Sequence, residues 1–182
     1  TVTAASLRGL EGTLTYIRWS AGIPEISTSV FKNHEKLETV IIPEGVTTIS
    51  YDGYSGYGVF YNCDSLKEVS LPASLETIGS YAFYGCDGLE SIEIPAGVQI
   101  IDDYAFCECT ALSNVTLGEG LKTIGSYAFY NCSALTELGL PDGLETIESD
   151  AFYGTSIGKL EFPDTVTAAS LRGLEGTLTY IR

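Results

Sequence analysis

Methionine is absent from this sequence of 182 residues, tryptophan and histidine occur once each, and basic residues are scarce. Nine Lys and Arg stand against 24 Asp and Glu, which gives a formal net charge of -15. An acidic surface of this kind repels phosphate groups, so we expect no nucleic-acid partner. No window approaches the roughly 18 uninterrupted apolar residues that a transmembrane helix needs, so we expect no membrane span in this segment.

The hydrophobic fraction of 45% is sufficient for a continuous core, so we expect a folded chain rather than a disordered one. Thr1 falls in the middle of a repeat, and no methionine is present. We therefore expect the native start, together with any secretion signal or membrane anchor, to lie outside this segment.

An internal repeat of 23 residues organises the sequence. Each copy reads Leu-x-x-Val/Ile/Leu-x-Leu/Ile-Pro-x-x-Leu/Val-x-x-Ile-x-x-x-Ala-Phe-x-x-Cys-x-x, and weaker copies extend the series in both directions. A fixed period of this length indicates a solenoid, in which each repeat forms one turn of a coil. We predict a single solenoid over residues 1–182, with turns that open at Leu14, Leu37, Leu66, Leu89, Leu112, Leu135, Ile157 and Leu178.

A longer period is superimposed on the short one. Residues 1–18 read TVTAASLRGLEGTLTYIR, and residues 165–182 repeat this string without a change, 164 residues later. Seven turns fill the interval, so the duplication is in phase with the short repeat. We interpret it as a higher-order repeat of 164 residues, which arises either from a longer tandem array or from ends that mimic one another.

Each turn contains two segments with the character of short strands. The segment from Leu89 to Ile94 is rich in β-branched residues, and Pro95 follows it where no further ladder donor is needed. Turn residues then lead to a second extended piece from Val98 to Ile101. We predict a mainly β fold, a right-handed coil of parallel short strands with about 23 residues per turn and with equivalent residues about 4.8 Å apart.

Two columns of equivalent residues are predicted to run through the core. The cysteine column continues into His34 at one end and into Thr155 at the other. Cysteines one strand spacing apart fit a disulfide poorly, because a bridge needs Cβ atoms about 3.8 Å apart, so we expect free, buried thiols. The two columns are Phe31, Phe60, Phe83, Phe106, Phe129 and Phe152, and Cys63, Cys86, Cys109 and Cys132.

No pattern in the sequence indicates catalysis. Cys107 and Cys109 form a single close pair, whereas metal sites normally need two such clusters, so a structural role is favoured over a redox or metal site. His34, the only histidine, is interpreted as a packed core residue rather than the base of a nucleophile. Asp102 and Asp103 are interpreted as solvated turn residues rather than an acid-base pair. We predict no enzyme activity, no cofactor and no metal.

One repeat is six residues longer than the others, and its insertion is our first candidate for ligand contact. Insertions in solenoids form loops on one face, often the binding face, and tyrosines among glycine and serine are typical of antibody binding loops. A tolerated surface loop is the alternative. The candidate residues are Tyr51, Asp52, Tyr54, Ser55 and Tyr57.

The outward positions of the predicted strands form a second candidate surface. They are polar, mixed in charge and shallow, so a protein or glycan surface is favoured as a target over a small metabolite. The residues singled out here are Glu68, Glu93, Thr116 and Glu137. Two rows of tyrosines flank the coil, either as a packed, half-buried edge or as a contact surface: Tyr61, Tyr84, Tyr130 and Tyr153, and Tyr81, Tyr104 and Tyr127.

The string Ile-Pro-x-x-Val-x-x-Ile-x-x-x-Ala-Phe-x-x-Cys-x-x-Leu resembles the BspA-like, or Treponema-type, leucine-rich repeat family over nearly the whole chain. This resemblance implies a non-catalytic protein that is secreted or displayed on a cell surface. It also implies adhesion, including binding to host extracellular-matrix proteins, and it carries no catalytic residues over to this chain.

Two classes of function remain open. In the first, the solenoid is an adhesive module that binds a protein or glycan. In the second, it is a structural spacer or a fibre-forming tandem array in which the solenoid continues head to tail, and head-to-tail self-association of separate molecules belongs to the same class. The 164-residue recurrence favours this class more than a lone domain would. Seven turns would advance about 34 Å per unit.

Overall fold

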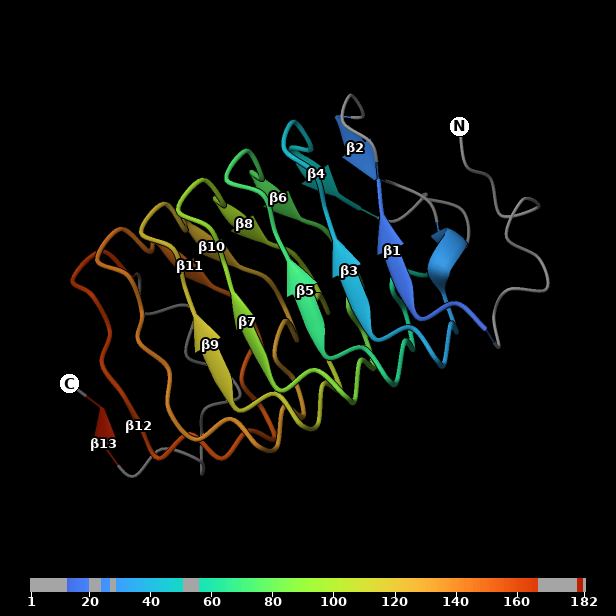
Figure 1. Ribbon diagram of the computed structural model, residues 1–182. Coiled ribbons are helices and arrows are strands. Elements are labelled where there is room, and N and C mark those ends of the chain that lie inside the picture. The colour runs from blue at the N-terminus through green and yellow to red at the C-terminus, as the bar shows by residue number, and fades with distance from the viewer. Residues whose placement is uncertain (1–12, 20–23, 27–28, 51–55, 167–179, 182) are drawn as a thin grey trace.

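Two layers of parallel strands run along the axis of a right-handed coil (Figure 1). The hydrophobic core lies between them. The computed structural model describes residues 13–19, 24–26, 29–50, 56–166 and 180–181. The fold is the predicted parallel, mainly β solenoid with about 23 residues per turn, and the one helical element described is the single 3-10 turn η1 at Ser29–Phe31. No described helix is long or apolar enough to span a membrane.

The first sheet is built from the strand that opens each turn, and we call its outer surface the front face. Neighbouring strands pair in parallel with equivalent residues opposite one another, as in Ile17↔Val40 and Val40↔Val69. The strands are β1 Tyr16–Arg18, β3 Thr39–Ile41, β5 Glu68–Ser70, β7 Ser91–Glu93, β9 Asn114–Thr116, β12 Lys159–Leu160 and β13 Tyr180–Ile181.

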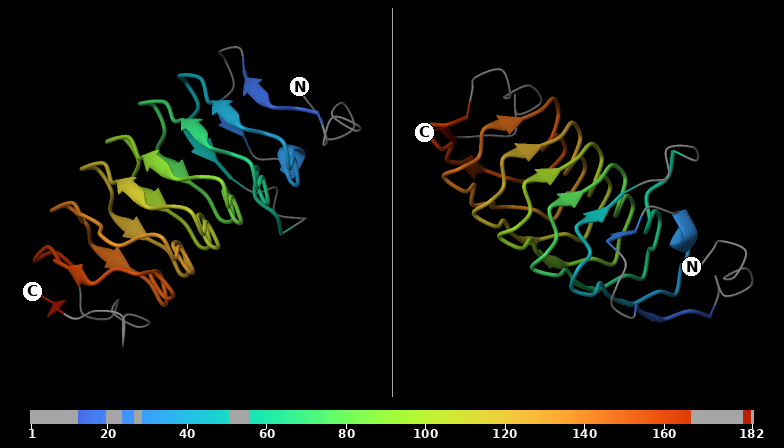
Figure 2. Two further views of the ribbon diagram at one scale, coloured as in Figure 1. Left: turned by 60° about the horizontal axis from the view of Figure 1, so that its bottom comes forward. Right: turned by 90° about the horizontal axis from the view of Figure 1, so that it is seen from above.

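The second sheet is built from the two-residue strands in the other half of each turn. Its six strands form one uninterrupted parallel ladder in which Ile78 lies opposite Ile101, and Ile101 opposite Ile124. They are β2 Glu25–Ile26, β4 Thr48–Ile49, β6 Thr77–Ile78, β8 Ile100–Ile101, β10 Thr123–Ile124 and β11 Thr146–Ile147. Figure 2 shows both sheets following the same coil from two further directions.

A tight turn that begins at proline connects the two strands of a regular repeat. The amide nitrogens of Leu75 and Val98 donate to the carbonyl oxygens of Pro72 and Pro95 at 3.1 and 3.0 Å. Proline suits this place because it presets φ and needs no ladder partner for its nitrogen. The apolar residue that ends the turn, Val98, is fully buried, so the turn places the second strand directly over the core.

The phenylalanine column forms the spine of the core, as the sequence predicts. Consecutive rings stack with centroids 5.2 to 5.7 Å apart and planes within 15° of parallel. Phe31 is 5% exposed and the other five phenylalanines are fully buried. The edge of the Trp19 ring covers the first member, with its centroid 5.4 Å from that of Phe31. A stack of this kind ties each turn to the next.

The cysteine column runs beside the phenylalanines and binds neighbouring turns together. The thiol of Cys109 donates to the carbonyl oxygen of Phe83 on the preceding turn at 3.1 Å, and the thiols of Cys63, Cys86 and Cys132 make the equivalent bonds at 3.1 to 3.2 Å. All five cysteines are free and buried, which confirms the predicted thiols. Burial raises the pKa of Cys63 to about 12, so this thiol stays protonated at neutral pH.

The front sheet departs from the even stacking that the repeat predicts. It falls into three groups, β1-β3-β5, β7-β9 and β12-β13, while the second sheet is continuous. The sequence predicts a strand at Glu137 like those at Glu68 and Asn114, but residues 137–139 belong to no strand. That expectation was wrong. The exception lies in the turn that has 22 residues instead of 23.

Candidate functional site

The outward side chains of the first sheet form two rows along the front face. Glu68 on β5, Glu93 on β7 and Thr116 on β9 are all exposed, as predicted, and so is Glu137. In the ladder, Glu93 lies opposite Thr116, whereas Glu68 lies opposite Thr39, whose hydroxyl donates to the Glu68 carboxylate at 3.4 Å. These four residues therefore share one face without converging on a single point.

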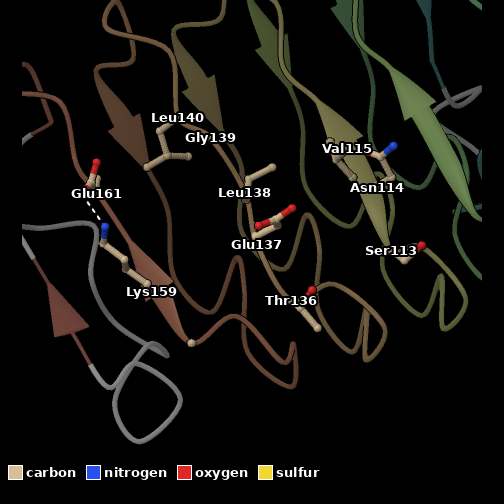
Figure 3. A pocket seen from close by; sticks show the side chains of 11 residues that line it. Ser113, Asn114, Val115, Thr136, Glu137, Leu138, Gly139, Leu140, Lys159 and Glu161 are labelled. Atoms are coloured by element: carbon tan, nitrogen blue, oxygen red, sulfur yellow. Dashed lines mark ion pairs between the residues drawn. The ribbon is translucent and has the colours of Figure 1, made fainter.

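A groove interrupts the front face between β9 and β12 (Figure 3). It is shallow and has a volume of about 690 Å³. The side chains around it are mostly polar, and Lys159 forms an exposed ion pair with Glu161 at 2.6 Å. The lining residues are Ser113, Asn114, Val115, Thr136, Glu137, Leu138, Gly139, Leu140, Gly158, Lys159 and Glu161. We call this feature the front groove.

A short turn and a missing side chain coincide at the front groove. The residue absent from the 22-residue turn lies between Thr155 and Ile157, where regular turns have two residues between these positions. The amide nitrogen of Ser156 instead donates to the carbonyl oxygen of Leu135 at 2.9 Å. Strand pairing in the front sheet stops after β9 and resumes only at β12. Gly139 adds to the opening because no atom lies within 4 Å of the place that a Cβ would occupy there.

The insertion follows strand β4 in the chain. Its residues Tyr51, Asp52, Tyr54 and Ser55 lie outside the described part of the chain. Tyr57 is described and half-buried: its ring packs edge-on against Tyr61 with centroids 4.8 Å apart, and the Lys32 ammonium lies 3.3 Å from its ring centroid. Tyr57 thus anchors the end of the insertion by aromatic and cation-π contacts.

The tyrosine rows are stacked along the coil. Tyr81, Tyr104 and Tyr127 stack with centroids 4.8 Å apart, while Tyr61 stacks on Tyr84 at 4.6 Å. All five are partly buried, so packing explains their stacking, whereas Tyr153 at the end of its row is 48% exposed. Burial raises the pKa of Tyr84 to about 12, as does the charge on nearby Cys107 and Tyr61.

The backbone at the first tyrosine row is in the left-handed region, with φ of 57 to 59° at Tyr81, Tyr104 and Tyr127. Gly58 holds the equivalent position in the preceding turn, where a Cβ would come within 1.9 Å of the Tyr81 carbonyl oxygen. Asp150, at the equivalent place in the turn after that of Tyr127, has the same φ of 57° without a ring, so this conformation belongs to the turn rather than to the tyrosine stack. The tyrosine row ends at this glycine, which directly follows Tyr57 at the end of the insertion.

The residues considered for chemistry are packed as structural groups. His34 continues the cysteine column beside Phe31 and is 1% exposed, and its Nδ1 lies 3.4 Å from the carbonyl oxygen of Lys32. Asp102 accepts a hydrogen bond from the Ser80 hydroxyl at 2.8 Å, and Asp103 accepts one from the Ser126 amide at 2.7 Å. These carboxylates join neighbouring turns. Within the described ranges, no group of three or more His, Cys, Asp or Glu could hold a metal ion.

Cys107 does not belong to the cysteine column. It occupies the place of a tyrosine between Tyr84 and Tyr130, and it is 3% exposed. Burial and the neighbouring Glu108 raise its pKa to about 12, against the lowering effect of a hydrogen bond from Tyr84. A protonated, covered thiol is a poor nucleophile, so Cys107 and Cys109 do not form a reactive pair.

Sequence reasoning identified Glu137 as a surface residue but missed the front groove around it. Two signals in the sequence mark the place. One is the 22-residue length of this turn, and the other is Gly139, which stands where other turns have Ser70, Glu93 or Thr116. Neither signal says that the two act on the same edge of the sheet, because only the fold places Ser156 directly before the strand that follows Gly139.

Solved structures with the same coil come from bacteria. A leucine-rich repeat protein from Bacteroides ovatus is 30% identical, with a TM-score of 0.60, and the match covers 84% of this chain and 44% of that protein. The T. pallidum leucine-rich repeat protein is 24% identical, with a TM-score of 0.69 and coverages of 94% and 86%. One from Eubacterium ventriosum is 26% identical, with a TM-score of 0.52 and coverages of 86% and 50%. The comparison with curated proteins found no match.

This chain therefore spans about half or less of the length of two of these three proteins, and most of the T. pallidum protein. A family model described as the BspA type leucine-rich repeat region matches six copies of its repeat over residues 10–57 and 54–172. The matched residues include the phenylalanine and cysteine columns that form the core. The chain belongs to the BspA-type leucine-rich repeat family.

Proposed function

We propose that this chain is a non-catalytic binding module of a secreted or surface-displayed protein, and that it contacts a partner protein through the front groove. The observation that carries the proposal is the interruption of the front sheet at Gly139, where an open depression lies on the front face. Polar side chains rim the depression, while Leu138 and Leu140 at its base are buried and half-buried. A polar rim around a more apolar centre is the usual anatomy of a protein interface.

The negative charge of the chain favours a positively charged partner. The chain carries a net charge of -15, and Glu137 and Glu161 stand at the groove, with Lys159 already paired to Glu161. A segment with lysine or arginine would be drawn toward this surface, and its association would slow as salt screens the attraction. We therefore expect a basic segment of an extracellular protein, with host matrix proteins as the first class to examine. Matrix glycans that are sulfated or acidic would be repelled.

Replacement of Gly139 by tyrosine tests this function. Space is open around Gly139, so the new ring would fill the groove and leave the core intact. Binding to a panel of immobilised matrix proteins, measured by biolayer interferometry, should weaken at least about tenfold, since each decade of affinity corresponds to about 1.4 kcal/mol. Gln99→Tyr is the matched control, because Gln99 is exposed beside β8 on the other sheet. Equal affinities of the Gly139→Tyr and control proteins would refute the proposal.

The tyrosine-rich insertion is a separate candidate contact. Replacement of Tyr51, Tyr54 and Tyr57 by serine should abolish attachment if the insertion holds the partner, and should leave it unchanged if the front groove does. Tyr57 also packs on Tyr61 and Lys32. The thermal midpoint of the variant should therefore be measured beside its binding.

A structural spacer is the second candidate function, and one observation favours it. The duplicated string supplies strand β13, which pairs with β12 as the next rung of the front sheet, Lys159 opposite Tyr180. A coil that accepts the start of its own sequence at its far end is suited to continuation as a tandem array of 164-residue units. The complete gene sequence tests this idea, since further copies should follow at that interval.

A further inference from the structure

The first and last strands of the front sheet have the same sequence. β1 is Tyr16–Arg18 and β13 is Tyr180–Ile181, and they occupy the same place in the two identical strings, 164 residues apart. They lie at opposite ends of the coil (Figure 1). The sheet therefore begins and ends on one and the same strand.

The two copies use opposite edges of this strand. β1 pairs with the strand that follows it, so that Tyr16 lies opposite Thr39 and Ile17 opposite Val40. β13 pairs with the strand that precedes it, so that Tyr180 lies opposite Lys159. One molecule thus shows both pairings of the string separately. A single copy of the string can make both at once, because the two sets of ladder bonds lie on different edges of an extended strand.

The contacts of β1 show what an incoming copy would gain. The amide nitrogens of Glu38 and Thr39 donate to the carbonyl oxygen of Thr15 at 2.9 and 3.1 Å. Ile17 is 8% exposed and packs in the hydrophobic core. The residues equivalent to Thr15 and Ile17 in the other copy are Thr179 and Ile181, so the same hydrogen bonds and the same apolar burial are available to it.

We propose that this chain associates head to tail with a second copy of itself, and that β13 of one molecule takes the place of β1 of the next against β3. At the joint, β13 of the first molecule pairs on one edge with its own β12 and on the other edge with β3 of the second molecule. Both pairings keep the registers seen for β12 with β13 and for β1 with β3. Because the string displaced and the string that replaces it are identical, the exchange conserves contacts, and protein concentration sets the balance. The inference rests on strand pairing and does not depend on binding at the front groove.

The same substitution, isoleucine to aspartate, can be made in either copy of the string. It tests separately the strand that β3 now holds and the strand that would replace it. Ile17→Asp weakens the hold of β1 on β3 and vacates the acceptor edge, whereas Ile181→Asp disables the incoming strand. In the full-length chain, Ile17→Asp should lower the concentration of half-association at least about tenfold, from the millimolar range expected when the competing string is tethered. Ile181→Asp should remain monomeric. Analytical ultracentrifugation of each protein and of the double variant gives the masses, and the double variant should also be monomeric.

Equal masses of the Ile17→Asp and Ile181→Asp proteins over the whole concentration range would overturn the proposal. Cross-linking tests the geometry with Ile17 and Ile181 both unchanged. One chain carries Thr39→Cys and the other Tyr180→Cys, and a short bismaleimide is added, to which the buried native thiols are poorly reactive. A 39-to-180 heterodimer should form. Asn114→Cys on the middle of the front face is the control, and linkage there as efficient as at position 39 would instead show side-by-side contact and refute the head-to-tail joint.

Discussion

The middle turns of the coil and the turn that opens at Leu135 follow the same sequence pattern but differ in structure. From Leu66 to Ala134, each turn has 23 residues, the phenylalanine rings stack 5.3 Å apart, and the cysteine thiols are fully buried. In the turn from Leu135, the spacing between the rings of Phe129 and Phe152 widens to 5.7 Å, threonine replaces cysteine, and the front strand is lost.

The difference shows that the core columns and the front sheet respond differently to the irregular turn. The core columns tolerate the change, since Phe152 remains fully buried and Thr155 is 7% exposed, with its hydroxyl bonded to the Phe152 carbonyl at 2.8 Å. The front ladder does not tolerate it. Side chains in a core can shift by a fraction of an ångström and stay packed, whereas a ladder hydrogen bond requires donor and acceptor within a narrow range of distance and angle.

The largest expected effect concerns the phenylalanine stack. Phe106→Ala should lower the free energy of unfolding by about 3 to 5 kcal/mol, because a ring stacked on both sides leaves a cavity. Phe152→Ala should cost less, since the described ring partner of Phe152 is Phe129, on one side. Urea denaturation of the two variants gives both values. Equal losses would show that the last turn packs as tightly as the middle ones.

A smaller effect concerns the cysteine column at high pH. Burial raises the pKa of Cys109 in the folded state above the ordinary 9.0. The unfolded chain therefore loses this proton first, so the stabilising contribution is complete below about pH 9 and declines as the pH rises toward the folded-state pKa. Between pH 8 and pH 10 each such thiol should cost about 1.4 kcal/mol.

Cys109→Ala isolates the contribution of one thiol. The decline in unfolding free energy from pH 8 to pH 10 should be smaller by about 1.4 kcal/mol in this variant than in the unmodified chain. Thr155→Ala, at the equivalent place in the last turn, should leave the decline unaltered because threonine does not ionise. If both variants keep the full decline, the cysteine column is not its source.

The smallest effect concerns the front groove. Gly139→Thr should raise the free energy of unfolding by about 0.5 to 1 kcal/mol, because glycine is unfavourable in extended backbone and threonine is favourable. Hydrogen exchange at residues 137–139 should slow if a strand forms. The reverse change in a regular turn, Thr116→Gly in β9, should be destabilising by a similar amount. No gain at Gly139 would mean that the 22-residue turn length alone keeps the front sheet open.

Much of the fold could be predicted from the sequence because the repeat leaves little choice. A column such as Phe83, Phe106 and Phe129 follows from a period of 23 once parallel stacking is assumed, and the stacked rings confirm it. The free thiols follow from the spacing between parallel strands. The BspA-like resemblance read from the motif is likewise confirmed by the family match.

The candidate sites were less predictable, since they depend on where the repeat fails. Glu68, Glu93 and Thr116 could be placed on one face from strand alternation alone. That Tyr57 packs under Lys32 could not be foreseen, because no local pattern brings these two residues together across the start of the insertion. The front groove needed the positions of three successive turns.

The amino-acid sequence by itself determined the coil, its period, its two core columns and the recurrence of one string after 164 residues. Only the tertiary structure decided that one face is continuous and the other divided, that Gly139 opens a groove, and that the two identical strings pair through opposite edges. The reason is that burial depends on the character of each residue and repeats with it, whereas strand pairing depends on the register between turns.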